Sequence, residues 1–268
     1  MDSGNIGFVL LCAAFVFVMT PGLAMFYGGL VRKKNVVNTM MTSIFIIGVG
    51  IVMWVLFGYS LSFAPSGNVF IGDFRWLGLE GVSLTEGYTD DASIPNMVFS
   101  AFQMMFAVIT PALITGAVAG RMKFKSIFVF TIFWSLIVYY PLAHMVWGQG
   151  GLLGADGIGA LDFAGGDVVH ISSGVSALVL CILLGKRHDY EHSIYRIHNI
   201  PTVVLGASLL MFGWFGFNAG SALAADGLAA HAFMTTGVSA AAAMLSWMLC
   251  DVIKNKKPTL IGASTGMV

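Results

Sequence analysis

The sequence predicts an all-α, polytopic membrane helix bundle, and two observations carry this prediction. Of the 268 residues, 57% are hydrophobic and only 10% are charged, whereas soluble domains average about 25% charged residues. Apolar stretches also recur along the whole chain, and each is long enough for the roughly 20 residues that a bilayer-spanning helix needs. The longest connection between them covers only residues 64–93. The sequence therefore indicates no separate soluble domain.

We expect seven spans and a short final segment. The spans are residues 5–31, 36–63, 94–120, 126–147, 168–185, 199–218 and 228–250. Two Thr-Pro pairs, at Pro21 and Pro111, are expected to interrupt the first and third spans, because proline lacks the N–H that a helix needs. Neighbouring groups must then satisfy the freed carbonyls. The 11 residues after Lys257 are too few to cross the bilayer.

The charged residues are sorted between the two sides of the predicted bundle. Twelve of the 13 basic residues follow spans one, three, five and seven, and only Arg75 lies on the other side. The positive-inside rule makes the basic side cytoplasmic, so we expect a multi-pass protein of the cell membrane with its N-terminus outside. The outer connections carry acidic residues that favour an approaching cation: Asp73, Glu80, Glu86, Asp90, Asp91, Asp156, Asp162, Asp167 and Asp226.

His170 stands nearly alone as an ionisable side chain inside a span. Asp, Glu, Lys and Arg are absent from the middle of every predicted span. An ionisable group inside the membrane is costly, which favours a pore or binding role. The alternative is a ring that hydrogen-bonds a neighbouring helix. Small residues at helical spacing, namely Ser173, Gly174, Ala177 and Cys181, predict that another helix approaches this face closely.

The remaining candidates are less specific when taken singly. The other histidines lie near span ends or in a basic loop: His144, His188, His192, His198 and His231. Three cysteines, all inside spans, indicate neither a disulfide framework nor a metal or redox motif. Phe102 and Phe106 lie four residues apart, as do Phe217 and Ser221, and helix packing or lipid contact can explain such rings. Trp147 at a span end is typical of an interfacial anchor.

Four segments together resemble a known family. They are "TPGLAMFYGGLVRKKNVVN", "AHMVWGQGGLL", "LDFAGGDVVHISSG" and "GWFGFNAGSA", and they resemble the ammonium transporters of the Amt/Mep/Rh family, most closely its Amt branch. The resemblance runs from the first span to the last residue. It implies an Amt-type fold of two inverted five-helix repeats. Residues 1–268 then form one transmembrane domain, with a first repeat at about 5–185 and a partial second repeat at about 199–268.

The resemblance also implies a function. Family members carry ammonium or ammonia through a narrow apolar pore in each subunit of a homotrimer, recognising the cation outside and then deprotonating it. They are not enzymes, use no cofactor or metal, and bind no nucleic acid, but some dock a PII-type regulator on their cytoplasmic loops. The family continues through about three more helices, so we expect this chain to lack the C-terminal third.

Site residues follow from the resemblance by position. The outer ammonium site consists of aromatic rings and a hydroxyl, which match Trp147, Phe106 and Ser221, and the acidic residue that orders it matches Asp162. Two stacked rings close the pore below that site and match Phe106 and Phe217. His170 matches the first of two pore histidines, whereas no residue of the chain matches the second.

Two other classes of protein remain to be weighed. Seven spans with an outer N-terminus also describe a seven-helix receptor or photoreceptor, but a retinal protein needs a lysine in a late span, and residues 228–250 contain none. The second alternative is an ammonium sensor that signals to a cytoplasmic partner. Uptake into vesicles separates transport from ligand-dependent partner binding.

Overall fold

The computed structural model describes residues 1–155, 157–187, 190 and 196–268, and within these ranges all regular secondary structure is helical. The predicted all-α class is therefore confirmed. Asp156, His188 and His192, which the sequence places in connections, lie outside the described residues.

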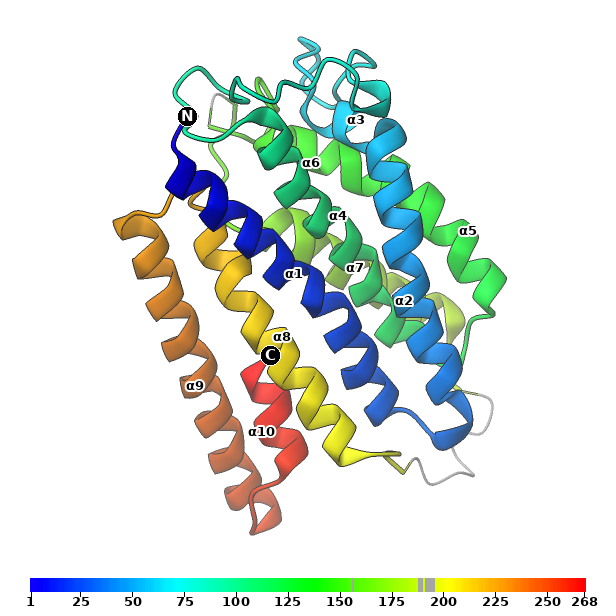
Figure 1. Ribbon diagram of the computed structural model, residues 1–268. Helices are drawn as coiled ribbons and strands as arrows, with labels where there is room; N and C mark the ends of the chain where they lie inside the picture. Colours follow the sequence, from blue (N-terminus) through cyan, green and yellow to red (C-terminus); the bar gives the residue numbers. More distant parts are fainter. Residues whose placement is uncertain (156, 188–189, 191–195) are drawn as a thin grey trace.

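The described residues form seven helical segments that are long and apolar enough to cross a membrane, as predicted. Figure 1 shows them as a bundle with one short helix beside it. Four of the segments are α1 (Ser3–Leu30), α4 (Asn96–Val118), α8 (Ile200–Gly220) and α9 (Gly227–Asn255). The second segment joins α2 (Val36–Met53) to α3 (Tyr59–Phe63), and the fourth joins α5 (Phe124–Trp134) to α6 (Tyr140–Trp147), each through one π-helical turn. In the fifth segment, a π-helical turn (Gly166–Ile171) leads into α7 (Ser172–Leu184), and the short helix is α10 (Leu260–Met267).

The two intramembrane prolines do not interrupt their helices, so that prediction was wrong. α1 continues through Pro21 and α4 continues through Pro111. Hydroxyl groups bond carbonyls on both sides of Pro111: Thr110 Oγ1 donates to Phe106 O at 2.6 Å, and Tyr27 of α1 donates to Leu113 O at 3.0 Å. Pro111 frees the carbonyl of Ala107, which neither bond reaches, so these hydroxyls brace the helix on both sides of the proline and do not replace the lost hydrogen bond.

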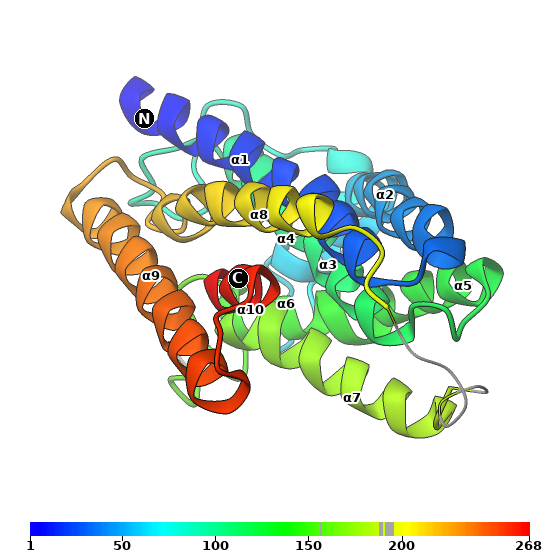
Figure 2. The same ribbon diagram turned by 90° about the horizontal axis from the view of Figure 1, so that it is seen from below.

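α1 and α8 pack against each other in opposite directions and lie side by side in both views of the ribbon (Figures 1 and 2). Glycines of α8 allow this approach, because a Cβ atom at Gly206 would collide with the backbone of Phe26 and one at Gly213 would collide with Met19. Close backbone approach through small residues is the usual way for membrane helices to associate. The packing fixes α8, and with it Phe217 and Ser221, relative to the rest of the bundle.

Hydrogen bonds join the connections between spans in two groups, one at each end of the bundle, as the predicted topology requires. At one end, Asp2 N donates to Ser93 O at 2.8 Å and Ala225 N donates to Asn5 Oδ1 at 2.9 Å. At the other end, Asn199 N donates to Gly29 O at 3.1 Å, and Arg121 Nη1 of the α4–α5 connection donates to Gly185 O at 2.8 Å. Successive spans therefore alternate in direction.

α9 contacts α8 near its start, where Phe233 stacks on Phe215 and Asn218 Nδ2 donates to Thr236 Oγ1 at 2.8 Å. Further along, the two helices diverge and α10 lies between them (Figure 2). Only Ala229 and Ala232 of α9 are buried. A Cβ atom at Gly266 of α10 would meet Ala243 O of α9 at 2.8 Å, so these two helices pack closely. The functional side chains predicted from the sequence lie on the other side of α8.

A matched pair of glycine substitutions tests the α1–α8 packing. Gly206→Ala places a methyl group against the backbone of Phe26, whereas Gly174→Ala on α7 meets no atom within 4 Å among the described residues. We expect Gly206→Ala to lower the free energy of unfolding by about 1–3 kcal/mol, the usual cost of overpacking. Gly174→Ala is expected to be neutral or stabilising, because alanine favours a helix over glycine.

Thermal unfolding of both variants in detergent measures the difference. Equal melting temperatures in the two variants would contradict the close packing of α1 on α8.

Candidate functional site

A cavity of about 750 Å³ opens at the end of the bundle where α1 begins. We call it the outer cavity, because the sequence predicts that this end faces outward. Four of the residues that the sequence predicted for the site line it together: Phe106 of α4, Trp147 of α6, Asp162 of the following connection, and Ser221 at the end of α8. Residues far apart in the sequence thus meet in one place.

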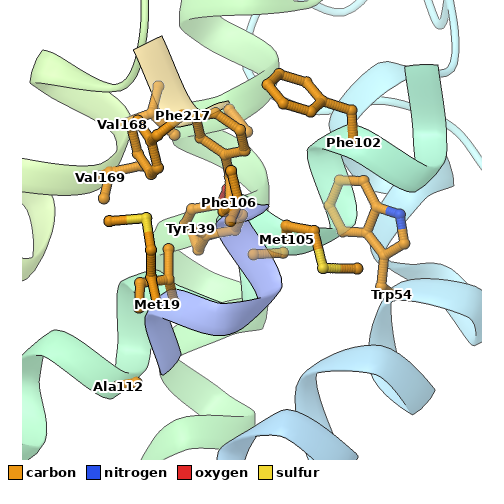
Figure 3. Close-up of a cluster of buried hydrophobic side chains, with 14 of the residues drawn as sticks. Met19, Trp54, Phe102, Met105, Phe106, Ala112, Tyr139, Val168, Val169 and Phe217 are labelled. Carbon is orange, nitrogen blue, oxygen red and sulfur yellow. The ribbon is translucent and has the colours of Figure 1, made fainter. Parts of the chain in front are cut away.

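Three aromatic rings lead from the cavity into the bundle. The ring of Phe106 meets that of Trp147 edge-on, with centroids 6.0 Å apart and an interplanar angle of 88°. On its other side, Phe106 packs on Phe217 with centroids 4.2 Å apart, and the two rings lie together in Figure 3. Both phenylalanines are 1% exposed. The pair therefore separates the cavity from the side chains beyond Phe217.

Asp162 organises the start of the fifth span. Its carboxylate accepts hydrogen bonds from the backbone N–H groups of Gly165, Gly166, Asp167 and Val168, at 2.5 to 3.0 Å. The first N–H groups of a helix have no partner within the helix and attract negative charge, so the carboxylate satisfies both needs. The chain can turn there because Gly165 adopts φ 101°, in the left-handed region that favours glycine.

The same residue also holds Trp147. The backbone oxygen of Asp162 accepts a hydrogen bond from Trp147 Nε1 at 3.0 Å. This bond occupies the only donor of the indole and fixes its ring beside Phe106. The interfacial anchor considered from the sequence would turn this N–H to the headgroups. Here the half-buried indole bonds inside the protein.

The polar atoms around the cavity suit a cation. Ser221 Oγ donates to Phe217 O at 2.8 Å, which leaves its lone pairs free to accept a hydrogen bond. In the described part of the chain, the charged side chains that line the cavity are Asp91 and Asp162, both acidic. Burial raises the pKa of Tyr88 at the cavity wall to about 12, so its hydroxyl stays neutral and accepts the Gln149 N–H at 3.0 Å.

Outside the cavity, Asp73 and Arg75 form an exposed ion pair of 2.7 Å in the 64–93 connection. Hydrogen bonding to the guanidinium of Arg75 lowers the pKa of the Asp73 carboxyl. Among the described residues, no group of three His, Cys, Asp or Glu side chains is placed to hold a metal ion.

His170 lies beyond the phenylalanine pair. Its ring is 6.0 Å from that of Phe217 and stacks on Trp214 of α8, with centroids 5.7 Å apart and an interplanar angle of 15°. Among the described residues its ring makes no hydrogen bond to a neighbouring helix, and the residue is exposed. Cavity, Phe106, Phe217 and His170 therefore follow one another in space.

The close helix contact predicted for the small residues after His170 is only partly present. Ser173 is buried, and Cys181 Sγ lies 3.6 Å from Ala117 O of α4. Gly174, however, is exposed and faces open space within the described structure. The reason is geometric: α4 covers one side of α7, and Gly174 lies on the other side.

Two residues of this region were not predicted from the sequence. Trp214 stacks on His170, and Gln103 lines the outer cavity. Each lies three residues before a predicted phenylalanine, so the helical spacing that relates Phe102 to Phe106 could have pointed to both. A glutamine inside an apolar span is a further signal, because polar side chains in membrane spans are costly.

Removing the carboxylate of Asp162 tests its organising role. Asp162→Ala leaves four backbone N–H groups at the start of the fifth span without their acceptor. We expect the free energy of unfolding to fall by about 1–3 kcal/mol and the fluorescence of Trp147 to change, because its hydrogen-bond acceptor is released.

Asp167→Ala is the control, because in the described structure no hydrogen bond to the Asp167 carboxylate is present. The measurements are thermal unfolding and tryptophan emission in detergent. Indistinguishable results for the two variants would show that Asp162 does not organise the site.

Comparison with known proteins places this geometry in a family. Residues 7–268 match the model of the Ammonium Transporter Family. The whole chain is 52% identical to an ammonium transporter of Bacillus subtilis (strain 168), of which it covers 65%, and 41% identical to the ammonium transporter Amt1 of Archaeoglobus fulgidus, of which it also covers 65%. The chain thus spans less than two thirds of the length of these relatives.

Solved structures agree with the sequence comparison. The whole chain superposes on 59% of the crystal structure of Mep2 from Candida albicans, with a TM-score of 0.90 and 33% identity. It superposes on 59% of Mep2 from Saccharomyces cerevisiae with a TM-score of 0.89 and 36% identity. The predicted Amt-type fold and the resemblance to Amt and Mep proteins are confirmed, and the relatives are named as transporters and not as enzymes. The chain is a member of the ammonium transporter family and forms a multi-pass membrane protein.

Proposed function

We propose that this protein carries ammonium across a membrane and recognises the cation in the outer cavity. The observation that carries the proposal is the succession of an aromatic, acidic cavity, a sealed phenylalanine pair and an intramembrane histidine, in a chain of this family. The relatives named above are described as ammonium transporters.

The cavity offers an ammonium ion several kinds of contact. The negative faces of the Trp147 and Phe106 rings attract a cation, an interaction of about 0.5–2 kcal/mol. The free lone pairs of Ser221 accept one of the N–H groups of the ion. The acidic groups Asp91 and Asp162 add a favourable field. Together these contacts replace part of the hydration shell that the ion loses.

The phenylalanine pair then favours ammonia over ammonium. Phe106 and Phe217 leave no polar group between their rings, and moving an unpaired charge into such surroundings costs far more than moving a neutral molecule. Ammonium can give up a proton, whereas potassium cannot. We therefore propose that the cation gives its proton to water at the open cavity, that the rings act as the gate, and that His170 handles ammonia or its proton beyond them.

The resemblance to the family implies four further properties of the protein, which we also propose. They are the division into repeats at about 5–185 and 199–268, a cell-membrane location with the N-terminus outside, a homotrimer in the full-length form, and docking of a PII-type regulator. The basic residues at one end of the bundle support the orientation and offer a surface for such a regulator. Native mass spectrometry tests the trimer, and a pulldown with PII protein under changing nitrogen supply tests the regulator.

One observation favours a second candidate function. The chain also superposes on a structure described as a sensor Amt protein, with a TM-score of 0.83 and 27% identity. An ammonium sensor would use the same outer cavity but would change its binding to a cytoplasmic partner. Uptake of ammonium into liposomes by the reconstituted protein favours transport, and ligand-dependent partner binding without uptake favours the sensor.

Two substitutions separate recognition from conduction. We expect Trp147→Leu to raise the half-saturating concentration of ammonium roughly twofold to thirtyfold, because it removes a cation–ring contact of about 0.5–2 kcal/mol. We expect His170→Ala to change the maximal rate or the discrimination against potassium while the protein stays assembled. Uptake in liposomes by the full-length protein, with methylammonium as competitor, measures both effects.

Trp76→Leu is the control, because Trp76 lies at the same end of the bundle but stacks on Tyr59 outside the cavity. An unchanged half-saturating concentration in Trp147→Leu would contradict recognition by the ring. Loss of assembly in His170→Ala, with normal conduction by the remaining assembled protein, would make His170 a packing residue.

A further inference from the structure

Gln103 lies at the outer cavity without an assigned role. It is on α4, one turn before Phe106, and both residues line the cavity together with Trp147 and Ser221. The side chain is 9% exposed, so it is almost fully enclosed by protein. A polar amide is therefore buried beside the aromatic rings at which a cation is proposed to bind.

The amide oxygen of Gln103 has an unused hydrogen-bonding capacity. Its Oε1 atom is buried and has no hydrogen-bond partner in the part of the chain that the structure describes. Nearby hydroxyls on the same helix are satisfied: Thr110 Oγ1 donates to Phe106 O, and Ser100 Oγ accepts from Trp54 Nε1 at 3.3 Å. Leaving a buried acceptor unpaired costs about 1–3 kcal/mol. Such a cost is typical of a site that is completed by a ligand.

The surroundings define the ligand that would complete it. The cavity is aromatic and its described charged groups are acidic, so the ligand is a cation. A neutral oxygen acceptor suits a cation that donates hydrogen bonds, and such charge-assisted bonds are stronger than neutral ones. Ammonium and small alkylammonium ions have both properties. Potassium has the charge but no N–H group to donate.

Gln103 and Ser221 would act from two directions. Gln103 comes from α4 and Ser221 from the end of α8, and α4 and α8 both pack against α1. An ammonium ion directs four N–H groups to the corners of a tetrahedron, so acceptors on different helices can bind different N–H groups. Aromatic faces, in contrast, attract any small cation. Acceptors placed in this way would therefore add selectivity to the attraction by the rings.

We propose that Gln103 is a further substrate-binding residue: its amide group rotates so that Oε1, which has almost no accessible surface in the structure, turns to the outer cavity and accepts a hydrogen bond from the ammonium ion there. This inference rests on the proposed function and names an additional contact of the same site. Gln103 raises the affinity for ammonium and alkylammonium ions and sets them apart from potassium.

The test uses the reconstituted protein in liposomes, with ammonium uptake, methylammonium competition and potassium competition as readouts. In Gln103→Leu, which removes the acceptor at similar volume, we expect the half-saturating ammonium concentration to rise roughly tenfold to a hundredfold, as expected for a hydrogen bond to a charged group. Gln103→Glu keeps an oxygen acceptor and adds a negative charge. We therefore expect this variant to retain or raise the affinity for ammonium, and we expect potassium to compete with ammonium more effectively than in the unsubstituted protein.

Thermal unfolding separates binding from a structural role. Removing a buried acceptor that has no partner is expected to leave the melting temperature unchanged or to raise it. Thr39→Val is the matched control, because Thr39 Oγ1 is also buried without a partner among the described residues but lies away from the outer cavity. We expect it to leave the half-saturating concentration unchanged. If Gln103→Leu does not fold, Gln103→Met removes the amide with a more adaptable side chain.

The outcomes are distinct. An unchanged half-saturating concentration in Gln103→Leu, while the unsubstituted protein transports ammonium, overturns the role of Gln103 and leaves the proposed function standing. A lowered melting temperature with no recovery of affinity in Gln103→Glu makes Gln103 a structural residue and also overturns the proposal. If the unsubstituted protein neither transports nor binds ammonium, the proposed function fails and the role of Gln103 fails with it.

Discussion

The hydrogen bonds that converge on Asp162 are the constraint on which the candidate site depends. One carboxylate accepts four consecutive backbone N–H groups at the start of the fifth span, and the backbone oxygen of the same residue accepts the indole N–H of Trp147. The start of one membrane segment is thereby joined to the end of the previous one. Without this junction, nothing else in the described structure would fix the indole N–H beside Phe106. The acidic residue thus acts through position as well as through charge.

The glycine-based packing of α1 and α8 is the second constraint. It brings Phe217 against Phe106, because α8 can reach its place only where glycines replace side chains along the contact with α1. A larger side chain at Gly206 or Gly213 would push α8 outward and separate the two rings. The contact between Phe106 and Phe217 therefore depends on the packing of α8 against α1, a helix to which neither ring belongs.

Much of the fold could be predicted from the sequence, because hydropathy and the distribution of basic residues reflect the bilayer directly. All seven spans lie close to their predicted bounds, and the hydrogen bonds between their ends fit spans that alternate in direction. The expected breaks at Pro21 and Pro111 failed, because local sequence does not show which neighbouring groups will support the helix. Tyr27, which supports α4 near Pro111, is 86 residues away from its partner in the chain.

The site was predictable where a motif carried it and not where only packing did. Trp147, Phe106, Ser221 and Asp162 belong to recognisable segments, and the structure brings them to one cavity. Trp214 and Gln103 became visible only in three dimensions, because an aromatic or amide side chain in an apolar span has many other possible explanations. The predicted helix contact at Gly174 is absent for a similar reason. Small residues predict that a second helix can approach, but they do not predict which face of the helix it covers.

A double-mutant cycle of Asp162 and Trp147 tests whether Asp162 acts by holding the Trp147 indole in place. Ammonium affinity is measured by calorimetric titration of the purified protein and of Asp162→Asn, Trp147→Leu and the double variant. If Asp162 acts by positioning Trp147, the double variant loses little more affinity than Trp147→Leu alone, and the coupling energy is at most that of the cation–ring contact, about 0.5–2 kcal/mol. If the affinity losses of the two single variants add up to that of the double variant, the carboxylate and the indole act independently. That result would contradict a positioning role for Asp162.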